Sequence, residues 1–203
     1  MKKYLECCCT SVEQLDYAQK HGAQRIELCE NLEVGGVTPS RELLAKAMQV
    51  SDIPVNVLVR PRGGGFCFNE AEVLSMLDDI EACAEAGAAG VVIGALDRDG
   101  NVDMLTMRRL IGKAREKGLS VTFHRAFDVC ADPLEAFERI VELGCDRLLT
   151  SGHEADAYQG RELIAELARR KQIIVMAGCG VRPSNIDAIY ADEWHASFSW
   201  FRE

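Results

Sequence analysis

One hydrophobic pattern recurs along the whole chain. An amphipathic segment ends at a glycine, and a short apolar run begins two or three residues later. Gly22 precedes the apolar run 25–28 in this way, and Gly87 precedes the run 90–93. Because glycine readily takes the left-handed conformation just past a helix, each repeat predicts a helix, a stop and a strand.

The repeats predict an α/β fold of eight strands separated by helices. The strands are expected near residues 4–9, 24–29, 54–60, 89–94, 119–124, 146–150, 172–177 and 193–197. Strands that alternate with helices call for a parallel sheet with right-handed crossovers. Eight of them predict a closed (β/α)₈ TIM-type barrel, formed as a single domain by residues 1–203. A doubly wound open sheet is the rival fold, but its G-x-G-x-x-G fingerprint does not follow the first strand.

Local signals predict several helix starts and an unusual end. Ser11 is expected to cap a helix, Thr38-Pro39 to place proline at a first helical position, and Asp132 to cap a helix that opens with proline. Only six residues follow Ser197, so the final helix of the barrel is expected to be missing or truncated. Either the aromatic segment 198–203 or a neighbouring subunit should cover the part of the barrel that this helix would otherwise cover.

Composition narrows the classes of partner. Hydrophobic residues make up 48% of the 203 residues and charged residues 27%, which is typical of a compact globule. The net charge of -9 argues against a nucleic-acid partner. No apolar run approaches the ~20 residues of a membrane span, and none near the start is long enough for export. The lack of such segments, together with nine irregularly spaced cysteines, predicts a cytoplasmic protein with free thiols.

Polar residues recur in steps of two at the carboxyl ends of five predicted strands. Active sites of parallel barrels lie at these ends, and residues two apart on a strand point the same way. Because the polar residues of all five strands point the same way, they predict a functional pocket. Buried ion pairs, such as Glu27 with Arg60, would also explain why these charged groups are buried. The residues are Glu6 and Cys8, Glu27 and Cys29, Arg60 and Arg62, Thr122 and His124, and His195 and Ser197.

The basic members of this set favour an anionic ligand. Arg60 and Arg62 flank a proline and precede three glycines, so they would present a cationic fork beside backbone N–H groups. Gly178 and Gly180 follow the seventh strand, where barrels often bind phosphate, although small residues there can simply allow close packing.

Other residues at the same rim suggest proton transfer and hydroxyl donation. His124 is a candidate general acid or base beside Glu6 and Glu27. Arg125 and Asp128 follow His124 closely and are candidate ligand-binding residues. Ser151, at the end of the sixth strand, is expected to offer a hydroxyl group to a ligand, and His195 and Ser197 extend the set on the eighth strand.

Two cysteines are candidate metal ligands. Cys8 and Cys29 are expected at equivalent places on neighbouring strands, whose axes lie about 4.8 Å apart. Two thiolates at that separation can jointly hold a soft ion such as Cu(I). Two small buried residues that fill the barrel mouth would explain the pair equally well. The cysteine spacing argues against a structural zinc site.

Five motifs resemble those of the CutC copper homeostasis family: 25–29 (RIELC), 35–40 (GGVTPS), 60–64 (RPRGG), 121–128 (VTFHRAFD) and 149–152 (LTSG). The resemblance runs from about residue 5 to residue 197. It implies a TIM-type barrel, a cytoplasmic location, a homo-oligomer and a role in copper handling, with Cu(I) ligands at Cys8 and Cys29. The chain departs from the family pattern at Cys179, which stands where glycine is usual, and after Ser197.

A rim rich in Glu, Arg and His is more than a soft-metal site requires. The alternative function is therefore a barrel enzyme that acts on a small anionic or phosphorylated metabolite. In that case Arg60 and Arg62 would bind the anion, and His124 would shuttle a proton. Glu6 or Glu27 would serve as the base or would orient it.

Overall fold

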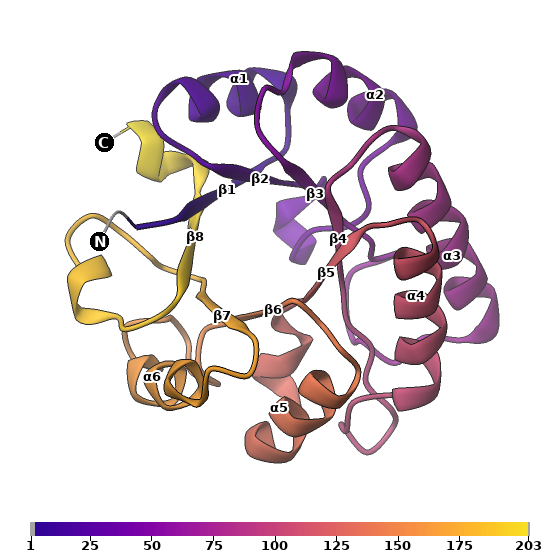
Figure 1. Cartoon of the computed structure of the whole chain (residues 1–203), viewed down its shortest axis with the longest axis vertical. Helices are drawn as coiled ribbons and strands as arrows, with labels where there is room; N and C mark the ends of the chain where they lie inside the picture. The colour runs from indigo at the N-terminus through magenta and orange to yellow at the C-terminus, as the bar shows by residue number, and fades with distance from the viewer. Residues whose placement is uncertain (1–2, 203) are drawn as a thin grey trace.

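The computed structural model describes residues 3–202, and in it eight parallel strands close a barrel in the order β1 to β8 (Figure 1). The pairing of β1 with β8 excludes the open sheet and confirms the TIM-type barrel. Each strand lies within the range predicted for it. The strands are β1 Leu5–Cys9, β2 Arg25–Leu28, β3 Val55–Leu58, β4 Gly90–Ile93, β5 Ser120–Phe123, β6 Arg147–Thr150, β7 Ile174–Ala177 and β8 Glu193–Ser197.

Six α-helices lie on the outside of the barrel within residues 3–202 (Figure 1). Between β7 and β8 there is only a short 3-10 helix, so the cover has one α-helix fewer than the repeating pattern predicted. This connection contains Gly178, Gly180 and Pro183, which disfavour a longer helix. The α-helices are α1 Val12–Lys20, α2 Arg41–Val50, α3 Glu70–Glu85, α4 Met104–Glu116, α5 Pro133–Glu142 and α6 Arg161–Arg170; the 3-10 helices are η1 Leu32–Val34, η2 Arg125–Val129, η3 Ile186–Ala188 and η4 Phe198–Arg202.

The predicted helix signals hold at two of three starts. The Ser11 hydroxyl accepts the Gln14 N–H at 3.3 Å, and Asp132 caps α5. The prediction for Pro39 is wrong, because α2 begins two residues later, at Arg41. There Ser40 is the N-cap, and it is itself held by hydrogen bonds to the Glu30 carboxylate.

The segment after β8 packs on the barrel's own flank. It forms η4, which lies against α1 and β1 (Figure 1). The Phe198 ring meets Tyr17 of α1 edge-on at 5.6 Å between centroids, and Phe201 is buried. The first of the two expected arrangements is therefore observed, and a short 3-10 helix stands where the barrel pattern calls for an α-helix.

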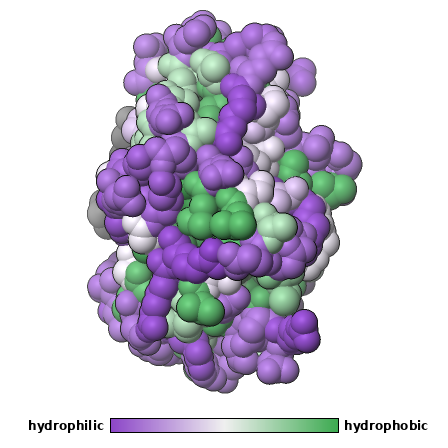
Figure 2. Space-filling view, turned by 90° about the vertical axis from the view of Figure 1, so that its right-hand side faces the viewer, coloured by the Kyte–Doolittle hydropathy of each residue, from purple (hydrophilic) through white to green (hydrophobic). Residues whose placement is uncertain are grey.

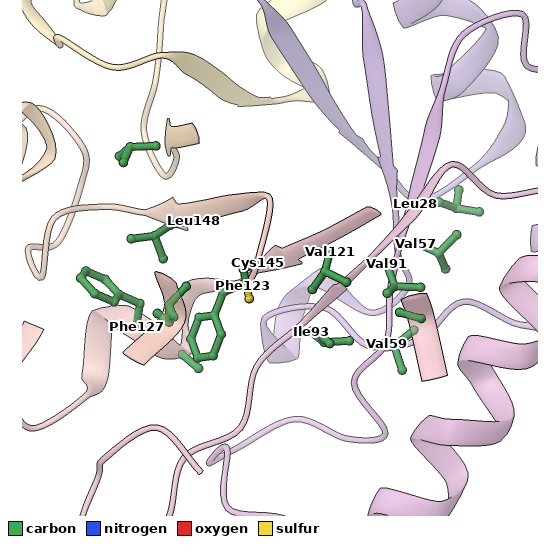
Figure 3. Packing of buried hydrophobic residues seen from close by; sticks show 14 of the residues in the cluster. Leu28, Val57, Val59, Val91, Ile93, Val121, Phe123, Phe127, Cys145 and Leu148 are labelled. Atoms are coloured by element: carbon green, nitrogen blue, oxygen red, sulfur yellow. The ribbon is translucent and has the colours of Figure 1, made fainter. Parts of the chain in front are cut away.

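Alternate residues along the strands separate an apolar layer from the barrel interior. The apolar side chains pack between the strands and the helices, as Figure 3 shows for Leu28, Val57, Val59, Val91, Ile93, Val121, Phe123 and Leu148. The residues between them, such as Glu27, Asn56 and Thr122, belong to the interior and are polar and buried. Because successive side chains of a strand point to opposite faces, this alternation concentrates the polar chemistry inside the barrel.

A buried ionic network occupies the lower part of the barrel. The Arg25 guanidinium of β2 forms ion pairs with Glu6 of β1 and, at 2.5 Å, with Glu193 of β8. Arg147 of β6 adds a second ion pair to Glu193 at 3.2 Å. Arg25 is only 3% exposed and Glu6 is fully buried, so each charge depends on the others for its solvation.

The outer surface is mainly polar. Figure 2, which faces the right-hand side of Figure 1 where α3 and α4 lie, shows apolar groups separated by hydrophilic ones. Leu74 on α3 and Leu105 on α4 are exposed apolar residues. No helix within residues 3–202 is long and apolar enough to cross a membrane.

We expect Arg25→Met to lower the free energy of unfolding by about 3–5 kcal/mol, because it leaves the buried carboxylates of Glu6 and Glu193 short of a cation. Lys46→Met, which breaks the exposed pair of Lys46 with Glu42 on α2, should leave the free energy of unfolding almost unchanged, because solvent screens such a pair. Urea denaturation of both variants measures the difference. Equal effects of the two substitutions would show that the network contributes little.

Candidate functional site

A cavity of roughly 300 Å³ opens at the carboxyl ends of the strands. This is the end of a parallel barrel where ligands bind. Eight of the predicted site residues line it: Cys8, Glu27, Arg60, His124, Arg125, Gly180, His195 and Ser197. Leu32, Gly35, Leu58, Phe66, Leu149 and Cys179 complete the lining.

One wall of the cavity carries sulfur, carboxylate and imidazole groups. A thiol, carboxylate and ring-nitrogen atom of Cys8, Glu27 and His195 lie within 4.8 Å of one another. Cys8 pairs in register with Glu27, so Cys29 lies two residues beyond the position opposite Cys8 and not at it as predicted. The two thiols nevertheless lie 3.5 Å apart, with Cys29 fully buried behind Cys8.

Glu27 is buried without a full set of partners. Its Oε2 atom has no hydrogen-bond partner among the described residues, and the side chain is 6% exposed. Burial, together with the charge of Glu6, raises the pKa of Glu27 to about 7, against the opposing effect of His195. Arg60 and Glu27 form no ion pair with each other, so the buried ion pair that would have explained both residues is not present.

His195 is oriented from below by Glu6. Its Nδ1 atom lies 2.8 Å from Glu6 Oε1, which leaves Nε2 as the free ring nitrogen. Burial alone would lower the pKa of His195, but Glu27 and Glu6 raise it above its ordinary value. Burial alone would likewise raise the pKa of Glu6, yet the His195 hydrogen bond and the Arg25 charge lower it to about 2. Glu6 is therefore a buried anion beneath the cavity, outside its lining.

Another part of the cavity wall carries Arg60, a buried cation without a carboxylate partner among residues 3–202. Its guanidinium donates to three backbone carbonyls, those of Val34, Gly36 and Gly64, at 2.6–3.2 Å. Its Nε–H has no partner among the described residues, and the group lies 4.7 Å from the centroid of the Phe66 ring. Burial and the nearby charge of Arg62 lower the pKa of Arg60. These carbonyls stabilise the charge but do not neutralise it.

His124 lies on the same wall and is neutral at physiological pH. Its Nδ1 accepts the Ala126 N–H at 3.2 Å, which assigns the proton to Nε2. Burial and the charge of Arg60 lower the pKa of His124 to about 3. Nε2 has no partner among residues 3–202. This arrangement suits a hydrogen-bond donor better than a group that gains a proton during a reaction.

Besides Glu6 and Cys29, four predicted site residues lie outside the cavity lining, each held by contacts of its own. The Arg62 guanidinium forms an ion pair with Glu72 at the start of α3 and does not join Arg60 in the lining of the cavity. Asp128 accepts the Thr150 hydroxyl and the Ser151 N–H, so it holds the loop after β6. The Ser151 hydroxyl donates to the Glu154 carbonyl.

Gly178 is the fourth of these residues. A Cβ atom there would lie 2.4 Å from the Leu149 side chain, so the small residue allows close packing. Arg125 lines the cavity, but its guanidinium is also held by Asp128 at 2.8 Å. Cys179, one residue before Gly180, has a φ of 72°, and its thiol is 3.3 Å from the Ala155 carbonyl oxygen.

Some functional positions were missed by sequence reasoning. Arg25 and Glu193 lie two residues before Glu27 and His195, so the same step of two could have found them. Leu58, which lines the cavity, likewise lies two residues before Arg60. Leu32 and Phe66 reach the cavity from loops, where no strand periodicity marks them.

The comparisons with known proteins agree on one family. A model of the CutC family matches residues 3–199. A relative named family protein CutC from Parabacteroides distasonis is 51% identical, covering 97% of this chain and 83% of the relative. Another of that name, from an Enterobacter species, is 47% identical over 95% of this chain and 79% of the relative.

One solved structure indicates the same family, and another shares the fold alone. A structure titled "Putative Copper Homeostasis Protein CutC" from Streptococcus agalactiae has a TM-score of 0.90 and 30% identity, covering 97% of this chain and 99% of that one. A thiamine phosphate pyrophosphorylase from Pyrococcus furiosus has a TM-score of 0.66 at 16% identity, covering 99% of this chain and 88% of that one, and shares the fold alone. The chain belongs to the CutC family.

Proposed function

We propose that this chain handles copper and binds Cu(I) through Cys8 and Cys29. The observation that carries the proposal is the distance of 3.5 Å between the two thiols, one of which faces the cavity. Soft thiolates are the protein ligands that select Cu(I). The S. agalactiae relative, which the chain matches over nearly its whole length, carries copper homeostasis in its title.

The residues fit a soft monovalent ion. Thiolates about 2.3 Å from a metal lie roughly 3.8 Å apart at a tetrahedral angle, close to the spacing of this pair. The hydrogen bond to Cys29 and burial raise the pKa of Cys8 well above its ordinary value, so the free Cys8 thiol is protonated. Binding of Cu(I) to Cys8 would release this proton, as is general for thiolate sites. The cytoplasmic location and the homo-oligomer implied by the resemblance stay predictions.

The anionic metabolite is a second candidate ligand, favoured by Arg60. A buried guanidinium that has, among the described residues, an unused Nε–H and no carboxylate partner is suited to an acidic ligand that enters the cavity. The partnerless Nε2 of His124 lies on the same wall and can donate a second hydrogen bond. Sequence analysis predicted that Arg60 and Arg62 bind the anion together. In this proposal Arg60 and His124 are the two donors instead.

Cu(I) titration in competition with a chromophoric chelator tests the first proposal. Cys8→Ser and Cys29→Ser should each weaken Cu(I) binding by more than about 100-fold, because loss of a direct ligand exceeds the 10–100-fold effect of a supporting residue. Cys67→Ser, which removes an exposed thiol elsewhere, should leave the affinity within about 2-fold. Unchanged affinity in the Cys8→Ser, Cys29→Ser double variant would rule out this site.

Calorimetric titration with inorganic phosphate and glycerol 3-phosphate tests the anion proposal. Arg60→Met should weaken binding by at least about 10-fold, the equivalent of one hydrogen bond to a charged group. Arg62→Met is the matched control and should change affinity by less than about 2-fold, because Arg62 pairs with Glu72 outside the cavity. Equal losses in the two variants, or no binding to the wild type, would contradict the proposal.

The neutral state of His124 has its own signature in stability. Its pKa of about 3 lies below the ordinary value of 6.5, so its contribution is present above pH 6.5 and is lost as the pH falls toward 3. Between pH 7 and pH 5 the wild type should lose about 2 kcal/mol more than His124→Gln. Denaturant unfolding at both pH values measures this, with His21→Gln, an exposed histidine, expected to follow the wild type. Parallel profiles of wild type and His124→Gln would show that His124 titrates normally.

A further inference from the structure

Three strands bring three different donor groups together at the cavity wall. We propose that Cys8, Glu27 and His195 form a site for a borderline divalent cation of the zinc type, with its fourth coordination position open to the cavity. The three groups come from β1, β2 and β8, which are neighbours in the closed barrel. Their donor atoms lie within 4.8 Å of one another.

The donor set is the first support for this site. Thiolate sulfur, carboxylate oxygen and imidazole nitrogen are the ligand types that zinc takes, and three protein ligands with an open fourth position are typical of its catalytic sites. Ligands at about 2.0–2.3 Å from the metal lie roughly 3.3–3.8 Å apart. The donor atoms, which lie within 4.8 Å of one another, therefore need to close by about 1.5 Å at most.

The unpartnered carboxylate is the second and independent support. Glu27 is buried, faces the cavity, and its Oε2 has no partner among the described residues. A buried carboxylate without a partner is costly, and a cation at this place would supply the missing one. A thiolate, a carboxylate and a neutral imidazole together balance the two positive charges of the ion.

The position of His195 is fixed as metal-binding histidines usually are. Glu6 holds Nδ1 at 2.8 Å and leaves Nε2 for the ion. A carboxylate behind the ligating ring is the common outer-shell partner of such histidines. Arg25 holds Glu6 in turn, so the ring is anchored to the rigid interior of the barrel.

The open position defines the class of molecule that would complete the site. Arg60 and His124 line the same cavity and offer N–H groups without partners. A small anion with two acidic or oxygen-bearing ends can reach the metal with one end and Arg60 with the other. The site shares Cys8 with the copper proposal but is distinct from it, because it requires Glu27 and His195 in place of Cys29.

Titration of metal-free, reduced protein with Zn²⁺ against a chromophoric chelator tests this site. The wild type should bind one Zn²⁺, and Glu27→Gln and Cys8→Ser should each bind it at least about 100-fold more weakly. Cys29→Ala should keep the Zn²⁺ affinity within about 3-fold while it loses Cu(I). Cys67→Ser is the matched control for the loss of an unrelated thiol. Thermal melting checks that each variant is folded.

Cobalt substitution gives a spectroscopic readout in addition to the affinities. Co²⁺ added to the wild type should produce a thiolate-to-cobalt charge-transfer band, and this band should be absent from Cys8→Ser. Failure of the wild type to bind Zn²⁺, or unchanged affinity in Glu27→Gln, would overturn the zinc site and leave the copper proposal standing. Loss of Zn²⁺ binding in Cys29→Ala equal to that in Cys8→Ser would also overturn it, because the thiol pair would then be the site for both ions.

Discussion

The ion pairs of Arg25 with Glu6 and Glu193, inside the barrel, are the interaction on which the rest of the site depends. They join β1, β2 and β8, where the first and last strands close the barrel. Glu6 is fully buried and also contacts His195, so the same carboxylate stabilises the interior and fixes an imidazole at the cavity wall. Removal of the cation would affect both, because a buried charge cannot be left without a partner at low cost.

Above this network the cavity has two chemically different walls. Cys8, Glu27 and His195 form one, and Arg60 and His124 form the other. In the proposals for this cavity, the first wall binds a cation and the second binds an anion. In the two metal proposals Cys8 is a shared ligand, with Cys29 completing the soft site and Glu27 with His195 completing the harder one. Occupancy of one site would therefore exclude the other.

The sequence predicted the fold well, because each strand–helix unit carries its own local signals. Apolar runs, glycine stops and caps such as Asp132 depend on neighbours in the chain. Sequence reasoning did not foresee that the α-helix between β7 and β8 is missing, because the number of strands alone implied an α-helix at that place.

For the site, strand periodicity brought Cys8, Glu27, Arg60, His124 and His195 to one cavity. It failed for Arg62, which lies beyond the end of β3 where the alternation no longer holds, and for the loop residues Leu32 and Phe66. The grouping of Cys8 with Glu27 and His195 depends on register across the barrel seam, which linear spacing does not reveal.

In both metal proposals, Cys8 is the ligand at the wall of the cavity. Anomalous X-ray diffraction from crystals of the reduced protein loaded with Cu(I) tests it most directly, because it locates the metal without reference to any variant. We predict a single strong peak within bonding distance of the Cys8 and Cys29 sulfur atoms. A peak at Cys67, Cys179 or any other place, with none beside Cys8, would contradict the account.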